Sequence, residues 1–392
     1  MRRSVLAVTG VVAAIGMGSE AGSAQGVPRL VRDAALDEGF GLVNRVRELP
    51  DGRLVVADPL SKTLQVVDLA KGRVEPFGRE GQGPEEYRQP DAVYALPGGR
   101  SLLVDLGNAR LTELGADLRF GETHPMATGT PGPGGNFEPR IPAGADGQGR
   151  IYYQTVGLAP GGALPTHAKV KRWDLATGEI VELGEAQLPA REDRSSGGPN
   201  AQQRMVRQIP LSAADGWAVG ADGRVALVRM GEPYRVDWID PDGTVHPGTP
   251  VPYDPIPIRT ADKNEWVQTS AQRGGGIGIS VEMNNSQVRT SFARGGGLGA
   301  EADINDYTWP ETKPAFDPGD VLVDPSGRAW VRRYRRAGEP PLYDVFDASG
   351  KRIGSVELEP ARRLVGFGNG TAYVIRFDEM DLQYIERYRL QG

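Results

Sequence analysis

The sequence predicts an all-β protein built as a ring of six four-stranded antiparallel sheets. Three observations lead to this fold class: a glycine turn that recurs six times before a short apolar strand, a second recurring turn, and a turn-rich composition. The 392 residues include 54 glycines and 31 prolines, which suits many turns without reaching low complexity. The absence of cysteine excludes disulfides and thiol chemistry, and a net charge of −6 gives no reason to propose a nucleic-acid partner.

Residues 1–24 have the pattern of a signal peptide. Arg2 and Arg3 precede an apolar run at residues 5–17, and small residues follow at 22–24. The run is shorter than the roughly 20 residues that span a bilayer. We therefore expect cleavage near Ala24, no transmembrane anchor, a periplasmic or secreted protein, and a single domain over residues 25–392.

The first recurring turn ends in Gly-Arg in five copies and in Gly-Thr in the last. Each copy precedes four or five mostly apolar residues, such as LVVAD after the first and SLLVD after the second. Glycine supplies the positive φ of a tight hairpin turn, and continuous apolar strands indicate that both faces are covered. The turn glycines are Gly52, Gly99, Gly149, Gly223, Gly327 and Gly370.

A second turn follows a strand that ends on aspartate, as in Asp68 with Gly72 and Asp240 with Gly243. Each unit therefore has about four strands, and six units predict a six-bladed β-propeller. Wide spacing of the turn glycines places insertions at about residues 185–212 and 248–318, on one face. The last unit lacks a strand, which residues 27–32 supply before an inner strand at 42–46, so that the N-terminal strand closes the ring. Two separate β-sandwiches are the alternative.

Residues 77–87, FGREGQGPEEY, precede Pro90. This segment resembles the glycine-rich G-x-G-P-G-E-F…P connector of the NHL-type and related six-bladed β-propellers of exported bacterial proteins. Glu85 stands where that family usually has glycine, and Tyr87 replaces phenylalanine. The family includes lyases, lactone hydrolases and binding proteins, so the resemblance implies a fold rather than an activity.

The residue six positions after each turn glycine ends the second strand of its blade, on the face that carries the insertions. If these side chains point inward, they form a rim with an acidic and a basic side that suits an anionic or zwitterionic ligand. The alternative is a ring of salt bridges and solvated strand ends. The rim residues are Asp58, Asp105, Thr155, Arg229, Arg333 and Arg376, with Arg332 adding positive charge and Glu86 and Tyr87 contributed by the connector.

The two insertions differ in pattern. The first is polar, with a short helix hypothesised around residues 201–208. The second predicts a helix over residues 262–272 capped by Thr260, and then a β-hairpin between glycine clusters at 273–278 and 294–299. We expect this hairpin to lie over the face as a lid, with a surface loop as the alternative.

No catalytic pattern stands out. The three histidines share no metal-ligand spacing, and a Gly-x-Ser-x-Gly elbow is absent from the sequence. We expect no cofactor, although Ca²⁺ stays open as an alternative at Asn44, Asp58, Asp105 and Asn108. The sequence thus favours a monomeric, non-catalytic propeller that binds a small molecule or an envelope protein. A metal-assisted hydrolase or lyase in the central channel is the alternative.

Overall fold

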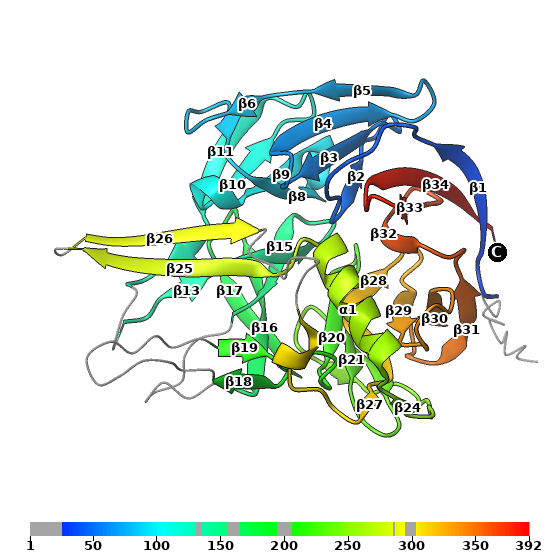
Figure 1. Cartoon of the computed structure of the whole chain (residues 1–392). Coiled ribbons are helices and arrows are strands. Elements are labelled where there is room, and N and C mark those ends of the chain that lie inside the picture. Colours follow the sequence, from blue (N-terminus) through cyan, green and yellow to red (C-terminus); the bar gives the residue numbers. More distant parts are fainter. Residues whose placement is uncertain are drawn as a thin grey trace, which may run out of the picture.

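The computed structural model describes residues 26–130, 135–155, 165–193, 206–284, 287–294 and 303–391. Six four-stranded antiparallel sheets surround a common axis, which confirms the six-bladed β-propeller (Figure 1). The predicted signal peptide lies outside these residues. In the part of the chain that the structure describes, no helix is long and apolar enough to cross a membrane.

The first three blades follow one another along the chain, and each runs from an innermost strand at the axis to an outermost strand at the rim. The first blade begins later than the sequence predicts, at Val46 instead of Leu42; Leu42 and Val43 are fully buried in the loop that leads into it. The strands are β2 (Val46–Glu48), β3 (Leu54–Asp58), β4 (Thr63–Asp68) and β5 (Arg73–Pro76); β8 (Pro90–Ala95), β9 (Ser101–Asp105), β10 (Arg110–Leu114) and β11 (Phe120–Pro125); β14 (Pro142–Ala145), β15 (Arg150–Gln154), β16 (His167–Asp174) and β17 (Ile180–Gln187).

The last blade takes its outermost strand from the beginning of the chain. β1 pairs antiparallel with β34, with Val31 opposite Arg389, so that the N-terminal strand closes the ring as predicted. The strands are β20 (Gly216–Val219), β21 (Val225–Arg229), β22 (Arg235–Ile239) and β23 (Val245–His246); β28 (Phe316–Val323), β29 (Ala329–Arg333), β30 (Leu342–Phe346) and β31 (Arg352–Glu357); β32 (Arg362–Gly368), β33 (Thr371–Phe377), β34 (Gln383–Gln391) and β1 (Arg29–Ala35).

The recurring glycines adopt the backbone that their sequence pattern requires. All six turn glycines between first and second strands have φ between 71° and 85°. A side chain would strain this left-handed conformation, so glycine is needed there. The second strands are buried along their length, as β3 and β9 show, because each is packed between two neighbouring blades.

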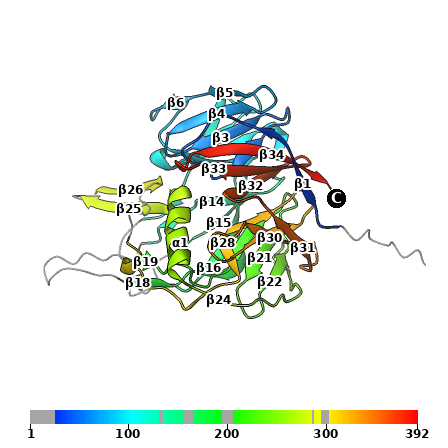
Figure 2. The same ribbon diagram turned by 45° about the vertical axis from the view of Figure 1, so that its right-hand side comes forward.

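The described parts of both insertions lie on one face of the ring (Figures 1 and 2). In an antiparallel blade, the turns between first and second strands lie at the opposite end, which puts the turn glycines on the other face. The helix in the second is confirmed as α1 (Thr260–Gln272), but Thr260 is its first residue and not its cap. The Arg259 backbone N–H instead donates to the Asp262 carboxylate at 2.8 Å. In the first insertion, residues 206–208 form strand β19 and no helix, and residues 201–205 lie outside the described chain.

The predicted hairpin forms, but it does not cover the centre of the face. Its base packs on the second blade, where Phe292 is buried and Gln89 exchanges hydrogen bonds with the Arg294 backbone. Its strands project beyond the ring, and α1 lies over the centre instead (Figure 1). The small strand pairs are β6 (Arg79–Glu80) with β7 (Glu86–Tyr87), β12 (Ala127–Thr128) with β13 (Glu138–Pro139), β18 (Arg191–Asp193) with β19 (Val206–Gln208), β24 (Ile256–Pro257) with β27 (Thr312–Lys313), and β25 (Ile277–Asn284) with β26 (Gln287–Arg294).

Candidate functional site

Helix α1 and the fifth blade enclose a cavity of about 540 Å³ on the insertion face. One face of the helix forms its first wall, because residues three, four and seven positions apart lie on the same side of a helix. The connection between β29 and β30 forms the opposite wall. The helix contributes Asp262, Glu265, Trp266, Thr269, Ser270 and Arg273, and the fifth blade contributes Arg332, Arg333, Tyr334, Arg335, Arg336, Glu339, Pro340 and Pro341.

Buried polar contacts hold the first half of α1 against the fifth blade. The Lys313 ammonium is 3% exposed and lies 2.8 Å from Asp262 Oδ1 and 2.7 Å from the Arg335 carbonyl. Asp262 also accepts the Ala337 backbone N–H at 3.0 Å. Burial opposes the charged form of Asp262, but Lys313 and the backbone donors hold its pKa below the usual value.

The end of α1 is tied to the axis of the ring. Arg273 Nη2 lies 2.8 Å from both Asp317 Oδ2 and Asp320 Oδ2 on β28, and Arg332 Nη1 lies 2.9 Å from Asp320 Oδ2. Both aspartates are buried. Burial opposes ionisation of Asp317, yet Arg273 and Arg332 keep its pKa below the usual value.

The cavity wall carries more positive than negative side chains. Seven cationic residues face four carboxylates, and several of the cations are paired locally. Arg336 is exposed and forms no ion pair with the described residues. The cations are Arg207, Arg273, Lys313, Arg332, Arg333, Arg335 and Arg336, and the carboxylates are those of Asp262, Glu265, Asp317 and Glu339.

Three further donors in the wall retain hydrogen-bonding capacity. The Nε groups of Arg273 and Arg333 are buried and have no partner within the described chain. Burial and the nearby Asp317 raise the pKa of Tyr334, so its hydroxyl stays protonated and can donate. Buried donors without partners are costly, and an anionic group would satisfy them.

An aromatic cluster forms one end of the cavity. Trp266 and Tyr307 line it, with ring centroids 5.6 Å apart in an edge-to-face arrangement. Trp309 packs edge-on to Trp266, and the Arg207 guanidinium lies 4.2 Å from the centre of the Tyr307 ring. The cavity therefore combines a basic wall with an aromatic surface.

A smaller cavity of about 240 Å³ adjoins the first and shares Arg273 and Arg332 with it. Arg363 lines only this smaller cavity, donates to the Val43 carbonyl at 2.9 Å, and leaves its Nε without a partner in the described chain. Burial lowers the pKa of Arg363 to about 10, which still leaves it cationic at neutral pH.

The two aspartates of the expected rim bind backbone. Asp58 is 2% exposed and accepts N–H groups from Gly41 at 2.7 Å and Leu42 at 3.1 Å, just before the inner strand of its own blade. Asp105 is fully buried and accepts the corresponding N–H groups of Arg88 and Gln89. Each carboxylate thus ties the incoming connector to its blade.

The basic residues of the expected rim are distributed over three blades. Arg333 lines the cavity beside Arg332, its neighbour in sequence, and its Nη1 lies 3.2 Å from Asp344 Oδ2. Arg229 instead pairs with Asp215 at 3.0 Å, and Arg376 lies over the Tyr384 ring at 4.3 Å. Neither lines the cavity beneath α1 or the smaller cavity beside it. The structure therefore brings Arg332 and Arg333 together and leaves Arg229 and Arg376 elsewhere.

The third blade contributes Thr155, whose hydroxyl donates to the Pro139 carbonyl at 2.7 Å. The connector residues also have internal partners. Glu86 bonds Arg79 and the Gly83 N–H at 2.7 Å each, and these contacts hold its pKa below the usual value. Tyr87 is 3% exposed, and its hydroxyl accepts the Leu64 N–H.

The four oxygen donors considered for calcium already have hydrogen-bond partners in the described chain. Asn108 bonds Asp105 at 2.7 Å, whereas Asn44 bonds Asp91 at 3.2 Å. Asp58 is committed to the backbone contacts given above. The calcium alternative stays a prediction.

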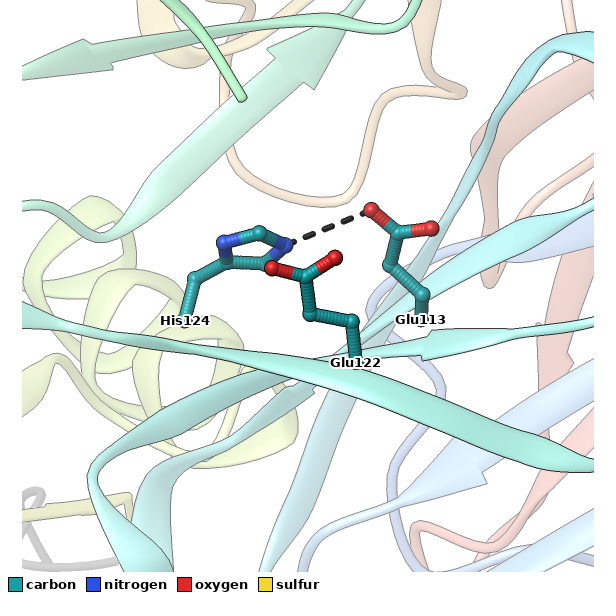
Figure 3. A group of neighbouring side chains, drawn as sticks. All are labelled: Glu113, Glu122 and His124. Carbon is teal, nitrogen blue, oxygen red and sulfur yellow. Dashed lines mark hydrogen bonds and ion pairs between the residues drawn. The ribbon is translucent and has the colours of Figure 1, made fainter. Parts of the chain in front are cut away.

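A different cluster brings together Glu113, Glu122 and His124 on β10 and β11, with their ligand atoms within 4.8 Å of one another (Figure 3). No metal-ligand spacing in the sequence marks this cluster, because the residues meet across a hairpin. Glu113 is already bonded to Arg100 at 2.6 Å and lies 3.3 Å from His124 Nε2. These contacts satisfy the carboxylate without an ion.

Sequence reasoning missed most of the cavity. Arg273, Lys313 and Tyr307 lie in the second insertion, which has no repeat to give them a register, and Arg207 lies in the first. Only Arg332 and Arg333, at the end of β29, marked this region in the sequence.

No known family model and no curated protein sequence matches the chain. Among solved structures, it is similar to a predicted exported protein from Bacteroides fragilis, with 10% identity, a TM-score of 0.45, and coverage of 93% of this chain and 95% of that one. It is also similar to a PQQ-bound aldose sugar dehydrogenase from Streptomyces coelicolor, with 12% identity, a TM-score of 0.41, and coverage of 94% and 99%. A gluconolactonase from Xanthomonas campestris has 11% identity, a TM-score of 0.40, and coverage of 93% and 95%. We draw no activity from these likenesses. The six four-stranded sheets of the chain identify it as a six-bladed β-propeller. The resemblance to NHL-type propellers stays a prediction.

Proposed function

We propose that the protein is a secreted or periplasmic propeller that binds a small anionic ligand, without catalysis, in the cavity between α1 and the fifth blade. The main observation in support of this proposal is the excess of cationic side chains around a concave site of about 540 Å³. That volume lies within the roughly 300–1,000 Å³ of typical small-molecule sites.

Arginine is suited to this role because its guanidinium can bind a carboxylate or phosphate through two parallel hydrogen bonds. Arg336 has no ion pair in the described chain, and Arg333 has a free buried Nε. Trp266 and Tyr307 offer an apolar surface beside these donors. A compact di- or tricarboxylate, or a phosphorylated small molecule, matches this combination.

The binding test is isothermal titration calorimetry with glutarate, citrate and inorganic phosphate, with glutaramide as the uncharged analogue. We expect at least one anion to bind and glutaramide not to bind. Arg336→Gln should raise the dissociation constant about tenfold, as expected for the loss of one charge-assisted hydrogen bond.

Arg53→Gln is the matched control, because Arg53 lies in the first turn on the opposite face and lines neither the cavity beneath α1 nor the smaller one beside it. Equal affinities for Arg336→Gln and Arg53→Gln would place the ligand elsewhere. Recovery of the bound ligand unchanged, followed by NMR, is expected for binding alone. Its conversion would instead favour the hydrolase or lyase alternative.

A further inference from the structure

Another cavity, of about 490 Å³, opens at the other end of the central channel, beside the turns between first and second strands. It shares no residue with the cavity beneath α1. The innermost strands of all six blades contribute apolar side chains to its wall, alongside polar and charged residues. One wall residue from each blade is Val46, Ala95, Ala145, Val219, Val323 and Phe367.

Two arginines lie beside these apolar side chains in the cavity wall. Arg45 and Arg47 flank the buried Val46 at the start of the first blade, and residues two apart in an extended segment share one side. Arg45 reaches past the second blade, with its guanidinium 5.0 Å from the Tyr94 ring centre and Nη2 3.4 Å from the Ala143 carbonyl on the third.

Neither guanidinium forms an ion pair with the described residues. Arg47 Nη2 lies 3.4 Å from the Arg100 carbonyl, which is long for a hydrogen bond, and its Nε is buried without a partner. Burial lowers the pKa of Arg47, which shows that its charge is poorly solvated there. Both side chains therefore retain donors for an incoming anion.

The carboxylates around the same cavity are engaged within their own surroundings. Asp146 pairs with Arg150 at 2.6 Å, and Asp324 pairs with Arg328 at 2.7 Å. Glu48 accepts hydrogen bonds from the Thr371 and Tyr373 hydroxyls of the sixth blade. Because Asp146 and Asp324 are neutralised by their own arginine partners, the remaining charged residues of the cavity wall are Arg45, Arg47 and Glu48. Their sum is one excess positive charge.

We propose that this channel mouth binds a monocarboxylate with an aliphatic tail, such as a medium-chain fatty acid. The carboxylate lies against Arg45 and Arg47, and the tail lies along the inner strands. A single excess charge favours a monoanion over a phosphate dianion. The apolar side chains that all six inner strands contribute favour a tail, because burial of its CH₂ groups stabilises binding.

The test uses decanoate below its micelle-forming concentration and follows binding to the purified protein by calorimetry. Decyltrimethylammonium has the same tail with the opposite charge, and acetate has the same carboxylate without the tail. We expect decanoate to bind, and both comparison compounds to bind at least tenfold more weakly.

The double variant Arg45→Gln/Arg47→Gln should weaken decanoate binding at least tenfold, whereas Arg53→Gln, on the same face but outside the cavity, should leave it unchanged. Ala95→Glu offers a second test, since Ala95 is exposed at the wall and a carboxylate there repels the ligand. It should abolish decanoate binding while the thermal midpoint stays unchanged.

Equal binding of decyltrimethylammonium would overturn the proposal, as would unchanged decanoate affinity in the double arginine variant. Neither result bears on the cavity beneath α1, because binding of glutarate, citrate or phosphate there is measured with a separate variant, Arg336→Gln.

Discussion

Arg273, the residue that follows α1, places its Nη2 atom 2.8 Å from Oδ2 of Asp320 on the innermost strand of the fifth blade. Asp320 is 3% exposed and also bonds Arg332. One residue of an insertion is thus joined to the axis of the ring. The covering helix and the propeller are therefore coupled in stability.

Arg273→Gln tests this coupling. The substitution leaves Asp317 and Asp320 with Arg332 as their remaining cation, and breaking a buried ion pair costs about 3 kcal/mol. We expect the free energy of unfolding, measured in urea, to fall by that amount. Arg335→Gln is the control, because its partners Glu339 and Glu357 are exposed, and it should cost at most about 1 kcal/mol.

Asp58→Ala tests whether this aspartate is a structural residue. Its carboxylate accepts four backbone N–H groups, from Gly41, Leu42, Leu60 and Ser61. Their loss should lower the free energy of unfolding by about 2–4 kcal/mol. Asp51→Ala, at an exposed turn, should change it by less than about 1 kcal/mol. A wild-type stability that rises with Ca²⁺, and no longer does so in Asp58→Ala, would support the metal alternative.

Glu386 links three strands of the closing blade, and its stabilisation depends on pH. It bonds Arg32 on β1 at 3.1 Å and Arg362 on β32 at 2.8 Å. Burial opposes its ionisation, but Arg362, Tyr388 and Arg32 hold the pKa of Glu386 below its usual value. Because the folded pKa is lowered, the contribution is full above the unfolded pKa of about 4.3 and is lost as the pH falls through the folded pKa.

Glu386→Gln should therefore lower the free energy of unfolding by about 2 kcal/mol at pH 7 and by much less at pH 3. Urea unfolding at a series of pH values measures the difference. Glu75→Gln, which removes an exposed partner of Arg73, should have little effect at either pH. A constant difference between wild type and Glu386→Gln across this range would contradict the assignment.

Closure of the ring by β1 can be tested with a disulfide, because the sequence contains no cysteine to compete. Val31 lies directly opposite Arg389 in the β1–β34 pair. Paired residues on neighbouring strands lie within the Cα separation that a disulfide requires. We expect Val31→Cys/Arg389→Cys to form an intramolecular disulfide on oxidation, seen as a shift in non-reducing electrophoresis.

Val31→Cys/Arg387→Cys is the matched control. Arg387 is opposite Ala34, so the two cysteines would be diagonal neighbours about 7–8 Å apart and poorly placed for a bond. Equal crosslinking in both variants would show a different register for the closing strand.

Local pattern was enough to predict most of the ring. A positive φ at Gly52 or Gly223 depends on a few neighbouring residues, so the recurring turn could be recognised without a structure. Strand ends were harder to predict: the first inner strand begins at Val46, since Leu42 is buried in the connector that Asp58 holds.

The candidate site was largely beyond prediction. Register places Asp58, Arg229 and Arg376 at equivalent strand ends, but it does not determine which local partner each side chain meets. In the fourth blade, Arg229 pairs with Asp215 on the connector that leads into that blade. In the first blade, Asp58 at the equivalent position instead accepts backbone N–H groups of the connector. Arg273 and Lys313 contact the fifth blade because of the course that a long insertion takes, and no repeat in the sequence predicts that course.

The placement of α1 over the axis divides the molecule into parts that can change at different rates. The six sheets depend on turn glycines and packed strands, whereas the helix that covers the basic wall of the fifth blade comes from one insertion between the fourth and fifth blades. Replacement of that insertion would alter what the face recognises while the ring is retained. Such a segment is a natural point of divergence among related proteins, and a convenient one at which to graft a new specificity.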